Sequence, residues 1–179
     1  MKIGYRVQQL IHALTAAPAQ QECQEVEAFL KPELMNLFSA MQPGEQAHSL
    51  RIYHSLRENG VQDPDLLTAA LLHDVGKNRL PLRLWERAYI VLANSLAPGL
   101  VETWGRSAIQ EGLPFWKQPF VIAVQHPEWG AQMTEQAGAS ILAVDLIRNH
   151  QVQEPEKHPE IGKHEVELLK QLQSFDNAY

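Results

Sequence analysis

Residues 63–77 read DPDLLTAALLHDVGK, and this stretch carries a helix start, a helical apolar pattern and a helix stop. Asp63 and Pro64 form a strong start signal, because an acidic side chain caps the first backbone N–H groups and proline suits the first helical position. Four apolar residues then recur at helical spacing: Leu66, Leu67, Ala70 and Leu71. Gly76 is expected to end the helix just after the His-Asp doublet at residues 73–74.

Nearly every other segment also repeats its apolar residues at helical period, and alternating β-branched runs are few. The first helix is expected over residues 5–15. A second starts near residue 21 and is interrupted at Pro32, because proline removes a backbone donor and clashes with the preceding turn. Further helices are expected over residues 33–41, 45–58, 82–95, 118–125, 128–137, 140–149 and 159–176. No repeat array is visible, so the pattern predicts an all-α fold.

The composition is typical of a soluble globular protein, with 45% apolar and 20% charged residues among 179. The net charge of −6 is spread over mixed signs, which argues against general nucleic-acid binding. Cys23 is the single cysteine, so an internal disulfide is excluded and a cytoplasmic location is expected. The start lacks the apolar core of a signal peptide. The most apolar stretch, residues 88–101, is shorter than the ~20 residues that span a bilayer, so no membrane anchor is expected.

Four histidines and two aspartates form a candidate ligand set: His48, His73, Asp74, His126, His150 and Asp176. Neutral imidazoles and carboxylates are the ligands that borderline first-row metals prefer. The doublet at residues 73–74 cannot share one face of a continuing helix, but both side chains can reach one ion if the helix ends there. His48 precedes His73 by 25 positions, which allows a helix, a turn and a return helix that bring both rings to one end of a bundle.

The order His, His-Asp, His, His, Asp resembles the HD-domain superfamily of metal-dependent phosphohydrolases, and most of all the branch whose two extra histidines hold a second metal. Residues 69–77 are the most specific part, since Val-Gly-Lys follows the doublet. The segment HPEWGA at residues 126–131 is similar to the family's His-Pro-x-x-Gly-Ala. The resemblance covers roughly residues 46–179. It implies an HD-domain-like helical bundle over residues 43–179, with residues 1–42 as an N-terminal helical segment packed on the core.

The resemblance also implies which residue holds which ion. The matches to the first metal site are His48, His73, Asp74 and Asp176. In the family the aspartate of the doublet bridges to a second metal, whose two histidines match His126 and His150. One or two divalent ions are therefore expected, and the resemblance leaves Mn, Fe, Mg, Co, Ni and Zn open.

Several features depart from the family pattern. His150 stands in NHQ where the family usually reads His-His-Glu, so Asn149 and Gln151 replace the flanking residues. The Gly-Tyr-Pro signature of cyclic-di-GMP hydrolases is absent after His150, which disfavours that substrate. Asp176 is matched by position and by Leu-Gln context alone. His158 begins a second His-Pro-Glu-x-Gly segment and competes with His126, although the start of the last helix is the favoured interpretation.

The resemblance implies hydrolysis of a phosphate ester by a metal-activated hydroxide, with Asp74 at the centre of the catalytic group. The expected substrate is a nucleotide or a related small phosphorylated metabolite, cleaved as a monoester or a diester. Lys77, one turn beyond the doublet, is a candidate phosphate contact, or it simply favours the helix C-terminus through the dipole. Arg51, three residues after His48, can contact phosphate or orient a ligand. A basic run can line the entrance or form a solvated helix face: Arg79, Arg83 and Arg87.

Two other functions remain open at this point. The same superfamily uses a six-residue set of this kind to hold two irons in oxygenases that cleave C–C or C–P bonds. The third possibility is a non-catalytic signalling or interaction module with a vestigial metal site, which the departures at Asn149 and Gln151 keep open. The sequence sets no oligomeric state.

Overall fold

The computed structural model of the chain describes residues 18–80, 83–106 and 114–178. Every regular element in these ranges is a helix, which confirms the all-α prediction. The α-helices are α2 (Gln20–Phe29), α3 (Pro32–Ser39), α4 (Pro43–Glu58), α5 (Pro64–Leu72), α6 (Leu84–Leu96), α7 (Pro98–Gly105), α8 (Gln118–Gln136), α9 (Ile141–Asn149) and α10 (Lys163–Asp176). Three short 3-10 helices connect them: η1 (Val75–Arg79), η2 (Phe115–Lys117) and η3 (Pro155–Lys157). The helix expected over residues 5–15 lies outside the described residues.

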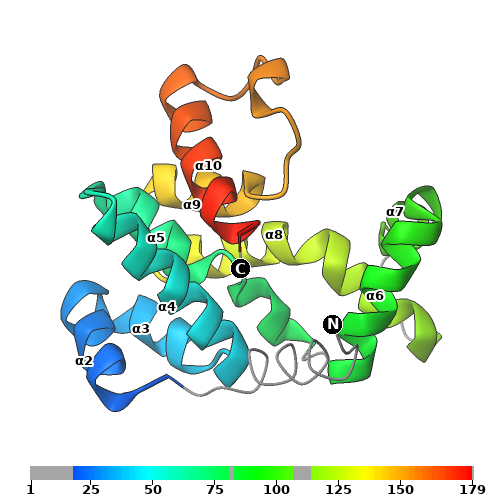
Figure 1. Ribbon diagram of the computed structural model, residues 1–179, viewed down its shortest axis with the longest axis horizontal. Coiled ribbons are helices and arrows are strands. Elements are labelled where there is room, and N and C mark those ends of the chain that lie inside the picture. Colours follow the sequence, from blue (N-terminus) through cyan, green and yellow to red (C-terminus); the bar gives the residue numbers. More distant parts are fainter. Residues whose placement is uncertain (1–17, 81–82, 107–113, 179) are drawn as a thin grey trace, which may run out of the picture.

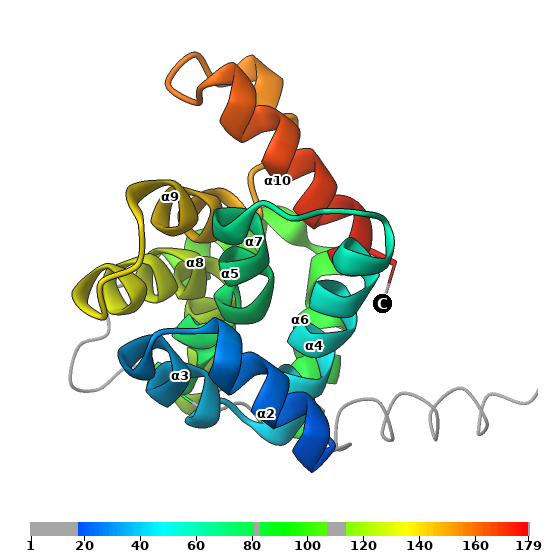
Figure 2. The same ribbon diagram turned by 90° about the vertical axis from the view of Figure 1, so that its left-hand side faces the viewer.

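Helix α5 lies beside α4 in the left half of Figure 1 and in the middle of the view in Figure 2. It contacts α4, α9, α10 and α3, so that neighbours lie on all of its sides. The cause is its sequence: its apolar residues go all the way around the helix, and such a helix must be buried. Asp63 caps it by accepting hydrogen bonds from the backbone N–H groups of Asp65 and Leu66, as the start signal predicted.

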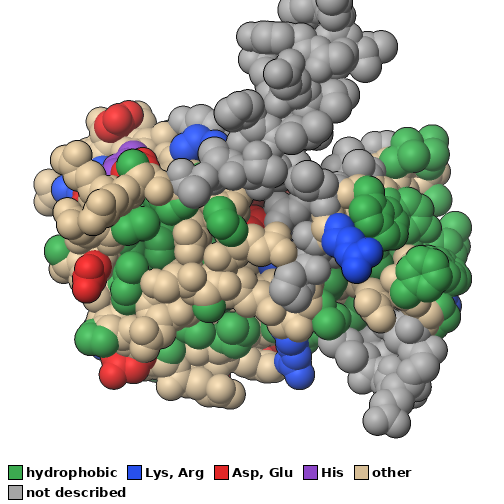
Figure 3. All heavy atoms as spheres, turned by 90° about the horizontal axis from the view of Figure 1, so that it is seen from below, with side chains coloured by type: hydrophobic (Ala, Val, Ile, Leu, Met, Phe, Trp, Pro, Cys, Tyr) green, Lys and Arg blue, Asp and Glu red, His purple; other side chains and the backbone are tan. Residues whose placement is uncertain are grey.

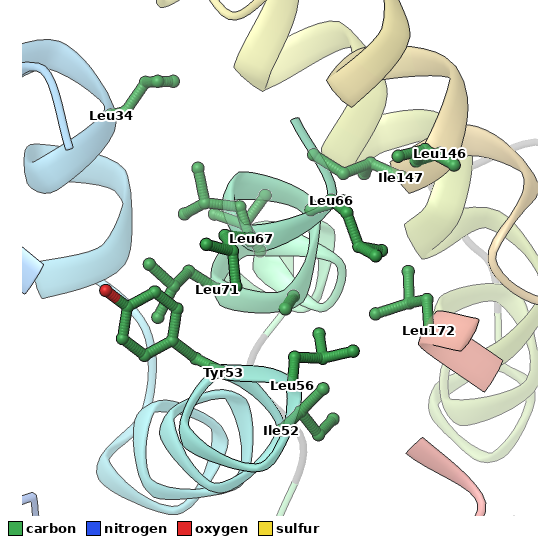
Figure 4. Close-up of a cluster of buried hydrophobic side chains, with 14 of the residues drawn as sticks. Leu34, Ile52, Tyr53, Leu56, Leu66, Leu67, Leu71, Leu146, Ile147 and Leu172 are labelled. Atoms are coloured by element: carbon green, nitrogen blue, oxygen red, sulfur yellow. The ribbon is translucent and has the colours of Figure 1, made fainter. Parts of the chain in front are cut away.

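The main apolar core forms where α5 meets its neighbours (Figure 4). Side chains of α5 and α4 interdigitate with apolar residues of α9, α10 and α3: Leu66, Leu67, Leu71, Ile52, Tyr53, Leu56, Leu146, Ile147, Leu172 and Leu34. Leu71 has no exposed surface at all. Burying one such side chain stabilises the fold by about 1.5–3 kcal/mol, so this cluster fixes the positions of the ends of α5, α9 and α10.

Several helix boundaries differ from the sequence-based expectation. Residues 118–125 and 128–137 were expected to be two helices separated at Pro127, and that was wrong, because α8 runs through Pro127 without a break. Helix α7 was not expected; it starts at Pro98, a residue that suits the first helical turn. The last helix begins at Lys163 and not near residue 159, since η3 and a short loop come first.

Helices α6 and α7 lie at one end of the molecule, away from α2 and α5 (Figure 1). They contact each other and α8. Most of the exposed large apolar side chains among the described residues belong to this end: Trp85, Leu92, Leu96, Leu100, Phe115 and Trp116. Apolar side chains gather on that end in the space-filling view (Figure 3, right). Four described apolar side chains of these two helices are therefore exposed: Trp85, Leu92, Leu96 and Leu100.

Within the described ranges, no helix combines the length and the apolar character that crossing a membrane requires.

Candidate metal centre

The six candidate ligands come from five helices that meet around the end of α5. They sit in the middle of α4, at the end of α5, in α8, at the end of α9 and at the end of α10: His48, His73, Asp74, His126, His150 and Asp176. Helix α5 ends at Leu72, and η1 starts at Val75. The chain thus leaves the α-helical path at the His-Asp doublet itself, and Gly76, which was expected to end the helix, lies inside η1 instead. This change of path lets two consecutive side chains face the same centre.

His48, His73 and Asp74 form the first group, and their candidate ligand atoms lie within 4.8 Å of one another. The nearest oxygen of Asp176 joins them: its Oδ1 atom is 2.8 Å from His48 Nε2 and 3.6 Å from His73 Nε2. His73 Nε2 is also 3.6 Å from Asp74 Oδ2. Asp176 is 128 residues from His48 in the chain, and α10 brings it back to α4.

Asp74, His126 and His150 form the second group, again with their ligand atoms within 4.8 Å. His126 Nε2 lies 3.3 Å from His150 Nε2 and 3.3 Å from Asp74 Oδ1. Asp74 therefore belongs to both groups, and its two oxygens face different histidines. All three side chains of the second group are at most 5% exposed.

Backbone carbonyls fix the orientation of the buried rings. His73 Nδ1 lies 3.1 Å from the carbonyl oxygen of Ala70, and His150 Nδ1 lies 2.7 Å from that of Ile147. A carbonyl oxygen only accepts, so each Nδ1 must be the donor. In the neutral ring the Nε2 atom then carries a lone pair that points into the centre.

Pro127 helps to fix the orientation of the His126 ring. Proline has no N–H, so the carbonyl oxygen of Ala123, four residues earlier in α8, receives no main-chain hydrogen bond from it. His126 Nδ1 donates there instead, at 3.1 Å, and also to the carbonyl oxygen of Ile122 at 2.9 Å. This bond replaces the hydrogen bond that the proline cannot make in α8, and it leaves His126 Nε2 facing Asp74.

The donor atoms fit a divalent metal. Two ligands that each lie ~2.1 Å from one ion are at most about 4.2 Å apart, and the 3.3 Å separations around His126 satisfy this limit. His73 Nε2 is buried and has no hydrogen-bond partner. His126 and His150 direct two lone-pair nitrogens at each other, an arrangement that a cation between them would satisfy. Four imidazoles with two carboxylates suit Mn, Fe, Co, Ni and Zn.

The electrostatic environment differs between the two groups. Burial lowers the pKa of His73, but the Asp74 and Asp176 carboxylates outweigh it and raise that pKa to about 9. Burial, with the charges of His126 and His73, lowers the pKa of His150 to about 3. A proton and a metal ion thus compete for His73, whereas His150 is neutral and ready to bind.

Both aspartates are held in the charged form. Burial by itself would raise the pKa of Asp74, but the Lys77 ammonium and His73 hold it well below its usual range. Burial acts in the same direction on Asp176, and the rings of His48 and His73 lower its pKa far more. Charged carboxylates are the form that binds a divalent cation.

Gly76 lets η1 approach α8 closely enough to form the centre. A Cβ atom on Gly76 would lie 2.0 Å from the carbonyl oxygen of His126 and 2.7 Å from the backbone nitrogen of Gly130. No larger residue fits without moving one of the two backbones. The glycine therefore sets how near Asp74 comes to His126.

Lys77 and Glu45 lie beside the first group. The Nζ atom of Lys77 is 2.5 Å from Asp74 Oδ2 and 3.7 Å from Glu45 Oε2. Sequence reasoning missed Glu45, which is 4% exposed although it is charged. Its place one turn before His48 on α4 was the available signal, because residues three apart share a helix face. Arg51 follows His48 by three residues on the same helix and is half-buried.

Other candidate groups lie outside both ligand sets. His158 Nδ1 pairs with Glu160 Oε1 at 3.0 Å, and Asn149 Nδ2 donates to Glu165 Oε1 at 3.0 Å. The Arg79 guanidinium lies 5.1 Å from the centre of the Trp129 ring, and Arg83 is exposed. The side chain of Arg87 lies outside the described part of the chain.

Comparison with protein-family models gave no match for this chain, and comparisons with curated proteins and with solved structures gave none either. The resemblance to HD domains therefore remains an expectation from the sequence motifs.

Proposed function

We propose that this protein is a metal-dependent phosphohydrolase of the HD type that cleaves small phosphate esters, with a nucleotide or a related metabolite as substrate. The observation that carries this proposal is the position of Asp74 between two groups of imidazoles, with one carboxylate oxygen toward each. A carboxylate in that position is suited to bridging two cations.

The chain's own residues would divide the work as follows. His48, His73 and Asp176 would hold one ion with Asp74, and His126 and His150 would hold the other. Divalent ions in such a site lower the pKa of water toward neutrality and neutralise phosphoryl oxygens.

Lys77 supports a phosphate substrate in particular. Its ammonium lies beside Asp74 and is 26% exposed, so it can contact both the centre and a ligand that arrives from solvent. A cation at this place favours an anionic substrate. We propose that Lys77 binds a phosphate oxygen and that Arg51 assists from α4.

The test combines metal content with turnover. The full chain is purified without chelator, its metal is measured by elemental analysis, and hydrolysis is assayed on aryl phosphates, nucleoside monophosphates and cyclic dinucleotides. Asp74→Asn should lose most of the bound metal and at least about a thousandfold in turnover, since the lost carboxylate belongs to both groups. Asp145→Asn is the matched control: Asp145 pairs with Arg148 at 2.6 Å on α9, and its loss should leave both quantities unchanged.

Three outcomes separate the candidate functions. Turnover that depends on Asp74 supports the proposal. A tightly bound iron pair that consumes oxygen with an organic substrate would assign the chain to the oxygenases instead. A chain that binds metal and turns over none of these phosphoesters would point to a non-catalytic module.

A further inference from the structure

The two ligand groups carry unequal charge. The first group has two carboxylates, because Asp176 Oδ1 joins Asp74 beside His48 and His73. The second group has only the shared Asp74 with two imidazoles. Affinity for a divalent cation rises with the number of charged ligands, so the second position is the weaker one by its number of carboxylate ligands.

Gln151 is the further polar group at that second position. It follows His150 directly, and its Nε2 atom is 3.4 Å from His126 Nε2. His126 Nδ1 is already committed to main-chain carbonyls. In the neutral ring Nε2 is therefore an acceptor, and the Gln151 amide donates to it. The amide of the neighbouring Asn149 faces Glu165 instead, so only one of the two amides reaches the centre.

We propose that Gln151 is a fourth protein ligand of the second metal position and that its neutral amide makes this position the weaker of the two. The inference rests on the proposed function, since it assumes that the centre holds metal. The two ions would then be taken up in order, the first between His48, His73, Asp74 and Asp176.

The Gln151 amide can interact with the second metal position both before and after an ion binds there. A carboxamide has a donor and an acceptor end of nearly the same shape, so a half-turn places Oε1 where Nε2 was. Without an ion, Gln151 Nε2 donates a hydrogen bond to the lone pair of His126 Nε2. With an ion bound, that lone pair and Gln151 Oε1 would both face the ion. An arriving ion must break this hydrogen bond, which weakens binding at the second position. The cost adds to the effect of the missing carboxylate and widens the difference between the two dissociation constants.

The experiment is a titration of chelator-stripped full-length chain with Mn²⁺, followed by calorimetry and by elemental analysis after desalting. Wild type should show two steps that differ at least tenfold in dissociation constant. Gln151→Glu should tighten the second step at least tenfold and leave the first within about twofold, because it adds a charge at one position only. Gln153→Glu makes the same change two residues further on, at an exposed side chain without a role in the centre, and should leave both steps unchanged.

Gln151→Leu removes both ends of the amide at nearly constant size. A ligand role predicts a second step at least threefold weaker. A second step that becomes tighter would show that Gln151 only competes for His126, and it would overturn the inference. An unchanged second step in both Gln151 variants would overturn it as well.

These failures differ from a failure of the proposed function. If the wild-type chain binds two ions and no substitution at Gln151 changes their binding, only the assignment of Gln151 as a ligand fails. If it takes up no Mn²⁺ at all, the metal centre and the inference fall together.

Discussion

The centre around Asp74 and the α6–α7 end are both helical, yet the centre buries polar side chains and the α6–α7 end exposes apolar ones. At the centre, charged or polar groups such as His73 and His150 are at most 3% exposed. At the α6–α7 end, Leu96 is 76% exposed and Leu92 is 58% exposed. Burying ionisable groups costs free energy unless they are paired, whereas leaving a leucine exposed costs little. The region that points to a functional site is therefore the one where polar groups are buried together.

The largest contrast should come from removing apolar volume in each region. Leu71→Ala in α5 should lower the free energy of unfolding by about 3–5 kcal/mol, because it leaves a cavity in a fully buried site. Leu96→Ala in α6 should change it by less than ~0.5 kcal/mol. Urea denaturation measures both. Equal losses would mean that α6 is covered in solution.

The next contrast uses two glycines. Gly76→Ala should cost about 2–3 kcal/mol and weaken metal binding, since the new Cβ meets the carbonyl oxygen of His126. Gly99→Ala in α7 meets nothing within 4 Å and should stabilise the protein by about 0.4–1 kcal/mol. Thermal melts with and without Mn²⁺ separate the two effects. A tolerated alanine at Gly76 would contradict the close crossing of η1 and α8.

The centre should also respond to pH. With a pKa of about 9, His73 carries a proton at neutral pH that an incoming ion must displace. Mn²⁺ affinity should therefore rise about tenfold per pH unit between pH 7 and pH 8.5. His73→Gln should flatten that slope, which calorimetry at several pH values would show.

The stability of the metal-free protein should fall as the pH rises, whereas its Mn²⁺ affinity should rise. A raised pKa means that His73 contributes stability that is fully present below its ordinary value of 6.5 and is lost as pH rises through about 9. The melting temperature of chelator-stripped protein should therefore fall between pH 6.5 and pH 9. The α6–α7 end offers no matching group among its described residues.

The smallest effect concerns a helix cap. Asp63 caps α5 with its side chain, whereas the N-cap residues of α6 and α7, Arg83 and Ala97, do not cap their helices with their own side chains. Asp63→Ala should cost about 1 kcal/mol, and Asp63→Asn should restore most of it. If Asp63→Asn were as unstable as Asp63→Ala, the charge and not the hydrogen bond would be responsible.

The sequence predicted most of the described helices and the start of α5, because these depend on local signals. Asp63 and Pro64 act within a few residues of their own position, whereas Gly76 lies inside η1 and did not mark the end of α5. Pro127 misled the prediction for α8, because a ring nitrogen of the preceding residue replaces the missing N–H, and local rules do not describe that exchange.

Local signals could not predict which residues from distant parts of the sequence lie close together. His48 and Asp176 are 128 positions apart, and no spacing rule connects them; only the resemblance to a family suggested that they belong together. Glu45 had only its place one turn before His48 as a signal, and Gln151 stood out only as a departure from His-His-Glu. Their positions beside the centre became visible only once α4, α8 and the end of α9 were placed.

The five helices that supply the ligand groups have one further consequence, for amide exchange with solvent. Because the groups come from α4, α5, α8, α9 and α10, an ion held there would resist any opening that separates these helices. Hydrogen–deuterium exchange in them should slow together when metal is added. Helices α6 and α7 supply none of the six groups, so their amides should continue to exchange at the metal-free rate.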